Sequence, residues 1–186
     1  MNLHDALSTR RTIQRFRPGS VPDAVIDDAL AAAVWAPNHK TTWPFRFVLP
    51  GPAARHALYE VGVSLKAAKR GGEVTPQLEA EQRAKMLDPD RLVVVVQRVA
   101  DDPVRAEEDY ATCACAVFAL MLSVHASGFG TKWSTGGVTT DPRSLALLGL
   151  APAEDRVVGF VWVGVPEVVP QAPRRPPLAG LVRRTD

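Results

Sequence analysis

YATCACAVFALMLSVHA, residues 110–126, is the stretch that decides the fold. Only Thr112, Ser123 and His125 interrupt its small and apolar side chains. A helix that is apolar on every side is expected to be buried on every side, and these 17 residues would span roughly 25 Å, about the width of a small domain. The pattern therefore predicts a central core helix. The glycine-rich stretch SGFGTKWSTGG, residues 127–137, is expected to form a hydrogen-bonding loop at its C-terminal end.

A membrane span is the competing interpretation of this helix. A span needs about 20 predominantly apolar residues, and this run is shorter and rich in alanine. It follows Glu107, Glu108 and Asp109, whose negative charges suit the first turn of an ordinary soluble helix. The pattern therefore favours a soluble core helix, and we expect no membrane partner.

Composition and cysteine spacing narrow the class of protein. The chain has 186 residues, enough for one domain with a substantial core, and we predict a single domain over residues 1–186. Its net charge of +2 gives no field that would favour a nucleic acid partner. Cys113 and Cys115 lie two residues apart on the helix and point to nearly opposite faces, so they share neither a disulfide nor a metal. Buried, reduced cysteines and the lack of a signal peptide favour a cytoplasmic location.

Helical and strand patterns alternate along the rest of the chain. Helices are expected at residues 2–8, 22–36, 53–68, 77–86 and 141–148, and strands at 45–49, 92–96 and 157–165. The continuous run LVVVV at 92–96 is typical of a central strand buried on both faces. Glycines within the 157–165 strand indicate close approach of another backbone or a ligand. These elements predict an α+β fold with one sheet between helices, and the proline-rich residues 166–186 predict an extended C-terminal arm that reaches across a surface.

Three polar segments carry candidate chemistry, each with a simpler alternative. Residues 10–17 contain four arginines and Thr12, which suit either a helix C-terminus or an anion site. Residues 36–45 combine an amide, His39, Lys40, hydroxyls and aromatic rings, either by chance or because they grip a flat heteroaromatic ligand. The charged residues 69–89 are either solvated or a mobile cover over a site.

Familiar catalytic motifs are absent from the sequence. It has no phosphate-binding P-loop, no dinucleotide fingerprint, no zinc spacing and no nucleophile elbow. His125, on the apolar helix, is expected to be a hydrogen-bonded core residue rather than a catalytic one. We therefore predict no metal site and no catalytic side chain, and infer that a cofactor carries the chemistry.

Five short motifs in order resemble the nitroreductase family. They are Arg10-Arg11-Thr12 with Phe16, Ala36-Pro37-Asn38-His39 before Pro44, Gly128-Phe129-Gly130 with Trp133, Gly159-Phe160 to Gly164 with Pro166, and Arg174-Arg175-Pro176. The resemblance implies a three-layer α-β-α sandwich with a central mixed sheet, and an intertwined homodimer that holds FMN at the subunit interface. It also implies hydride transfer from NADH or NADPH through the flavin to nitroaromatics, quinones or similar small-molecule acceptors.

The resemblance also implies a set of FMN-binding residues. Arg10, Arg11 and Thr12 would hold the phosphate and ribityl chain, with Arg175 meeting the phosphate from the arm. The remaining flavin contacts would be Trp35 and His39, from the other subunit, and Trp133, Ser134 and Thr135. The sequence departs from the family pattern at Gln14, where many members have a basic residue near the flavin ring, and at Trp35 and Trp43.

Two alternatives to a reductase stay open at this stage. One is a flavin-binding or flavin-degrading relative without nitroreductase activity. The other is a non-enzymatic module whose arginines meet nucleic acid or an acidic protein, which the nearly neutral charge disfavours.

Overall fold

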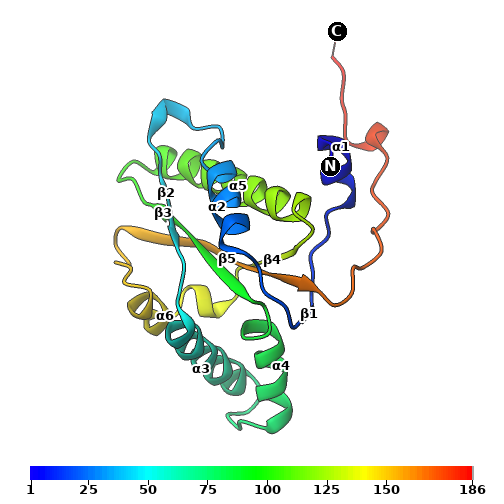
Figure 1. Ribbon diagram of the computed structural model, residues 1–186. Helices are drawn as coiled ribbons and strands as arrows, with labels where there is room; N and C mark the ends of the chain where they lie inside the picture. Colours follow the sequence, from blue (N-terminus) through cyan, green and yellow to red (C-terminus); the bar gives the residue numbers. More distant parts are fainter. Residues whose placement is uncertain (186) are drawn as a thin grey trace.

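In the computed structural model, residues 1–185 are described, and a five-stranded sheet lies between two layers of helices (Figure 1). The α-helices are α1 (Leu3–Thr9), α2 (Asp23–Ala33), α3 (Pro52–Lys69), α4 (Pro76–Met86), α5 (Pro103–Ala126) and α6 (Pro142–Leu147). The strands are β1 (Phe16–Arg17), β2 (Phe45–Val48), β3 (Arg91–Arg98), β4 (Gly130–Ser134) and β5 (Asp155–Pro166). Short 3₁₀ turns are η1 (His39–Thr41), η2 (Gly137–Thr139) and η3 (Leu178–Gly180).

The long strand β5 organises the sheet. The order is β1-β5-β3-β2, and β4 also pairs with β5. All these strand pairs are antiparallel, and an isolated bridge between Thr12 and Thr131 adds a parallel contact. The sheet is therefore mixed through this one bridge, which brings the N-terminal segment alongside β4.

Alternate side chains of the central strands pack into two separate cores. Val93 and Val95 of β3 face the layer that contains α2 and α5. Val94 and Val96 face the layer that contains α3, together with Trp162 of β5. Burial on both faces confirms the expectation for residues 92–96, and the two layers confirm the predicted three-layer α-β-α sandwich (Figure 1).

Helix α5 is the longest element, but its burial differs from the sequence expectation. It begins at Pro103, earlier than expected, because the Asp102 side chain accepts a hydrogen bond from the Val104 backbone N–H at 3.2 Å and caps the helix. One face packs against α2 and the sheet, and Cys113 is fully buried there. The opposite face exposes Cys115 and Phe118 to solvent. The prediction of all-round burial, and of two buried cysteines, is therefore wrong for a single chain.

By length and composition alone, α5 would pass as a membrane span. Its packing explains the apolar sequence in another way. Val117, Leu120 and Val124 are fully buried against other elements, as expected of a core helix.

The glycine-rich stretch after α5 is partly a strand rather than a loop. Residues Gly130–Ser134 form β4 and pair with residues 160–164 of β5, since the long β5 offers an edge that β3 leaves free. Two glycines of β5 admit close neighbours, but the nearest are aromatic side chains rather than the expected backbone or ligand: the Trp133 indole lies over Gly159, and the Phe16 ring lies over Gly164. A side chain at either glycine would displace the aromatic ring that covers it.

The C-terminal segment leaves the sheet at Pro166 and runs away from the body past α1 (Figure 1). Its side chains are exposed, including Leu178, Leu181 and Val182. The arm is therefore extended, as its prolines predict.

Candidate functional site

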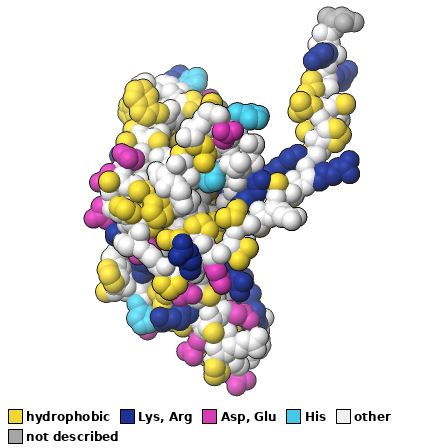
Figure 2. Space-filling view, turned by 45° about the vertical axis from the view of Figure 1, so that its right-hand side comes forward, with side chains coloured by type: hydrophobic (Ala, Val, Ile, Leu, Met, Phe, Trp, Pro, Cys, Tyr) yellow, Lys and Arg dark blue, Asp and Glu magenta, His cyan; other side chains and the backbone are white. Residues whose placement is uncertain are grey.

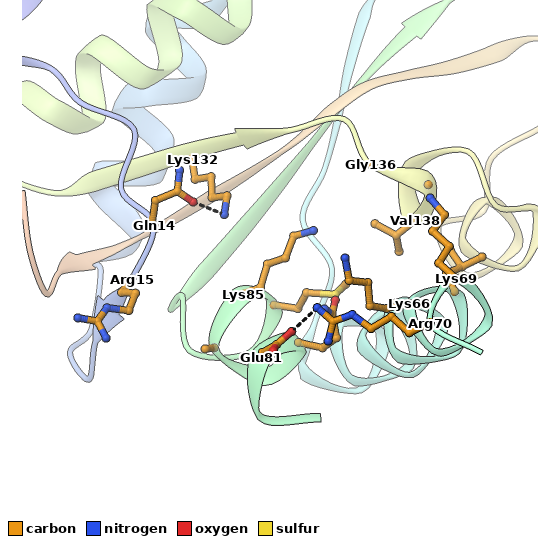
Figure 3. Close-up of a pocket in the computed structure, with 16 residues that line it drawn as sticks. Gln14, Arg15, Lys66, Lys69, Arg70, Glu81, Lys85, Lys132, Gly136 and Val138 are labelled. Carbon is orange, nitrogen blue, oxygen red and sulfur yellow. Dashed lines mark hydrogen bonds and ion pairs between the residues drawn. The ribbon is translucent and has the colours of Figure 1, made fainter. Parts of the chain in front are cut away.

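A cavity of about 530 Å³ lies between α3 and α4 on one side and β4 with η2 on the other (Figure 3). This volume is within the usual range for small-molecule sites. Its lining includes Gln14, Lys66, Gln82, Lys85, Lys132, Gly136 and Gly137. The charged segment 69–89 therefore forms one wall of a cavity instead of being only solvated; its role as a mobile cover stays a prediction.

The N-terminal segment links this cavity to the predicted arginine site. Thr12 forms the bridge with Thr131, and the Ile13 backbone N–H donates to the Thr131 carbonyl oxygen at 2.9 Å. Two residues after Thr12, the Lys132 Nζ donates to Oε1 of Gln14 at 2.6 Å, at the cavity wall. Residues 12–14 thus lie alongside β4, and Gln14 connects the segment that begins at Arg10 to the cavity wall.

The arginines predicted to hold a phosphate act on one another electrostatically. Burial, and then the charges of Arg11 and Arg175, lower the pKa of the Arg10 guanidinium, and phosphate binding by these residues stays a prediction. Within residues 1–185 we find no acidic side chain in ion-pair contact with these three arginines. Basic side chains gather where the arm leaves the body (Figure 2). An uncompensated cluster of this kind suits an anionic ligand.

His125 lies beside this cluster at the end of α5. Its Nε2 is 2.9 Å from Oγ1 of Thr9, in agreement with the expected hydrogen bond, although the imidazole is only half-buried. Burial, followed by the charges of Arg10 and Arg11, lowers the pKa of the imidazole. His125 is therefore biased toward its neutral form and adds little positive charge to the cluster.

Trp133, Ser134 and Thr135 lie at the end of β4 and continue from the cavity wall. The Trp133 indole packs into the core that contains α5 and donates to the Val158 carbonyl oxygen at 3.2 Å. The Ser134 hydroxyl is buried without a hydrogen-bond partner among residues 1–185. Thr135 is exposed and borders a different hollow. Contact of these three residues with a flavin stays a prediction.

The His39 loop lies toward the N-terminal half of α5, away from the arginines, and Trp35 lies beside the middle of the helix with Ala114, Cys115 and Phe118. The loop that carries His39 is tied to α5 by Thr42, whose hydroxyl donates to Oδ1 of the buried Asp109 at 2.6 Å. From Asp109 to His125 the helix rises 16 steps of about 1.5 Å, or roughly 24 Å. Trp35 is 87% exposed. Neither Trp35 nor His39 lines the cavity, and the length of α5 keeps the His39 loop away from the arginines within one chain.

Sequence reasoning missed the basic residues of the cavity. Lys66 comes from α3, Lys85 from α4 and Lys132 from β4. They are far apart in sequence and follow no motif, so only the packing of α4 on α3 and the pairing of β4 with β5 reveals them. The unusual charge of residues 69–89 was the one available signal.

Comparison with known proteins identifies the family. The model described as the nitroreductase family matches residues 7–165, most of the chain. The chain belongs to the nitroreductase family. Among curated relatives, it is 27% identical to the putative NAD(P)H nitroreductase YfhC of Bacillus subtilis over 177 residues, which cover 95% of this chain and 90% of the relative. It is also 27% identical to a 5,6-dimethylbenzimidazole synthase of Rhodobacter capsulatus, over 92% of this chain and 86% of the relative.

Solved structures of the family share the fold. A nitroreductase-like protein from Bacillus cereus superposes with a TM-score of 0.85 at 23% identity, covering 100% of this chain and 97% of that protein. A putative nitroreductase from Desulfovibrio desulfuricans, solved in complex with FMN, gives 0.75 at 22% identity, covering 100% and 98%. These likenesses confirm the α+β nitroreductase-like fold predicted from the sequence.

The residues present suit FMN by their chemistry. A phosphate requires clustered cationic donors, which Arg10, Arg11 and Arg175 supply without competing carboxylates. A flat ring with polar edges requires a cavity of several hundred Å³ with donors on its walls, which Gln82, Lys85 and Lys132 supply.

Proposed function

We propose that this protein is an FMN-dependent oxidoreductase that takes hydride from NADH or NADPH and passes it to nitroaromatic, quinone or similar acceptors. The observation that carries the proposal is the pairing of residues 12–14 with β4, which sets the segment after Arg10 and Arg11 against the cavity wall at Gln14. It joins an arginine cluster suited to a phosphate with a cavity suited to a ring, as a phosphorylated flavin requires. Bound FMN would supply the redox chemistry, consistent with the absence of a catalytic side-chain motif from the sequence.

In this proposal the chain's own residues bind and orient the cofactor. Arg10, Arg11 and Arg175 neutralise the phosphate, and Thr12 lies between the arginines and the cavity. A hydrogen bond to a charged group contributes about 1.5–3 kcal/mol, so two or three such contacts fix the tail of the cofactor. Residues of α3 and α4 form the wall opposite β4 and exclude water from one side of the ring.

We also propose that the active form is a homodimer whose interface includes the exposed face of α5. This face forms an apolar groove with the end of α2, lined by Trp35, Ala114, Cys115 and Phe118. A twofold axis that sets two α5 helices antiparallel would place the Asp109 end of one beside the His125 end of the other. Trp35 and His39 of one chain would then approach the arginines of its partner.

An absorbance spectrum tests the proposal directly. The purified protein, or the protein after addition of FMN, should show bound flavin absorbance that bleaches anaerobically with NADH or NADPH and returns when a nitroaromatic or quinone is added. A flavin that binds but is not reduced by either nucleotide would support a flavin-binding relative instead, for which the similarity to the dimethylbenzimidazole synthase is the supporting observation. A protein that binds no FMN refutes the proposal.

A further inference from the structure

Four lysines line the cavity, and apart from the exposed Lys69 they are partly buried without a neutralising partner. Lys66, Lys85 and Lys132 are each half-buried, and within residues 1–185 we find none of them in an ion pair with a carboxylate. The acidic side chain in the cavity lining, Glu81, is already paired with Arg70 at 2.9 Å (Figure 3). The walls of the cavity therefore carry an excess of positive charge, in a chain whose net charge is only +2.

The lysines act on one another electrostatically. Burial, and then the charge of Lys66, lowers the pKa of Lys85. Burial, and then the charge of Lys85, lowers the pKa of Lys132. Figure 3 shows Lys132 extending from β4 and Lys85 from α4 into the same space. A group with negative charge between them would relieve both the repulsion and the burial of unpaired ammonium groups.

Gln14 fixes the position of Lys132. The amide oxygen accepts from the Lys132 ammonium at 2.6 Å, and because the amide is neutral it orients the charge without cancelling it. Gln14 itself is held by its neighbour Ile13, whose backbone is bonded to β4. The lysine is therefore directed at a defined place on the cavity wall, with its charge left for a ligand.

We propose that Lys66, Lys85 and the Gln14-tethered Lys132 form an anion subsite that binds the negatively charged edge of a planar ring. The inference rests on the proposed function and deepens it. Two ligands share this chemistry: the ring of bound FMN, which gains negative charge on reduction, and an aromatic acceptor that carries an acidic group.

The flavin arm of the test measures the midpoint potential of bound FMN in the holoprotein. Lys132→Gln should weaken binding of reduced FMN about tenfold relative to oxidised FMN, which is a fall of about 30 mV for a two-electron couple. Lys132→Arg keeps the charge and should restore the potential. Gln14→Leu should lower the potential part of the way by releasing the tether. Arg83→Gln is the matched control, because Arg83 is an exposed cation on α4 outside the cavity lining.

The acceptor arm compares two nitroaromatics of similar shape by calorimetry on the protein as purified. 4-Nitrobenzoate should bind at least fivefold more tightly than 4-nitrobenzamide, and Lys66→Gln or Lys85→Gln should abolish the preference while Arg83→Gln keeps it. A shift in potential alone assigns the subsite to the flavin ring, and a loss of preference alone assigns it to the acceptor.

If all three lysine variants keep the wild-type midpoint potential and the wild-type preference for 4-nitrobenzoate, the subsite is overturned, even where FMN binds normally. A protein that takes up no FMN refutes the proposed function separately, and the nitrobenzoate comparison then decides the lysine subsite by itself.

Discussion

The indole of Trp133 occupies the space that a β-carbon at Gly159 would need, and its Nε1 donates to the Val158 carbonyl oxygen at 3.2 Å. This contact joins β4 to β5 next to the cavity wall. It explains why β5 has a glycine in an otherwise apolar strand.

Gly159→Ala should therefore destabilise the protein by about 1–3 kcal/mol, since the new methyl group forces the indole out and breaks its hydrogen bond. Urea denaturation followed by tryptophan fluorescence measures the change. Gly180→Ala in the arm, where nothing lies within 4 Å of the added methyl group, should change stability by less than about 0.5 kcal/mol. An unchanged midpoint for Gly159→Ala would contradict the described packing of Trp133.

If the arginine cluster binds the phosphate of FMN, replacing one of its arginines should weaken FMN binding. Arg10→Gln and Arg175→Gln should each weaken FMN binding by about ten- to a hundredfold, because each removes one charge-assisted contact to the phosphate. Fluorescence titration of the apoprotein with FMN gives the dissociation constants. Arg183→Gln removes a charge from the same arm and should bind FMN like the wild type, which separates a specific contact from a general effect of charge.

The exposed face of α5 predicts how the protein assembles. Phe118→Arg places a charge in the apolar groove and should yield a monomer that has lost most of its FMN affinity. Leu147→Arg is the matched control, since Leu147 is equally exposed on α6, on the other side of the sheet. Light scattering coupled to size exclusion gives the masses. A monomeric mass for the wild-type protein would contradict the proposed interface.

The reactivity of the two cysteines tests whether the exposed face of α5 is covered in a dimer. Burial, and then the charge of Asp109, raises the pKa of the Cys113 thiol to about 12. At pH 8 only about one Cys113 in ten thousand is a thiolate, so it should not react with a thiol reagent until the pH rises far above neutrality. Cys115 is exposed in one chain and should be covered in the proposed dimer.

Counting reactive thiols at pH 8 separates these states. We expect none in the native dimer, one per chain in the Phe118→Arg monomer, and two in denaturant. One fast-reacting thiol per chain in the wild-type protein would place Cys115 outside the interface.

Much of the architecture follows from local patterns in the sequence. The run LVVVV at 92–96 became a strand buried on both faces, and the expected helix ends lie within three residues of those observed, apart from the start of α5. Strand β4 was missed, because its five residues lie among glycines and become a strand only by pairing with the distant β5. Burial of α5 was overestimated, because an apolar sequence does not show whether a helix face is covered by the same chain or stays exposed for a second chain.

The candidate site also contains residues that could be predicted from the sequence and residues that could not. Arg10, Arg11 and Thr12 are adjacent in sequence, so their grouping could be predicted, and Arg175 joined them through a family resemblance. Lys66, Lys85 and Lys132 could not be grouped, since their proximity depends on three elements meeting in space.

The length of α5 has a last consequence. Because α5 rises roughly 24 Å between Asp109, beside the His39 loop, and His125, beside Arg10, a complete flavin site on the proposed dimer is built from two molecules. Cofactor occupancy then obeys the law of mass action for the protein as well as for FMN. Diluting the holoprotein below the dissociation constant of the dimer, into buffer that keeps free FMN constant, should release the bound flavin.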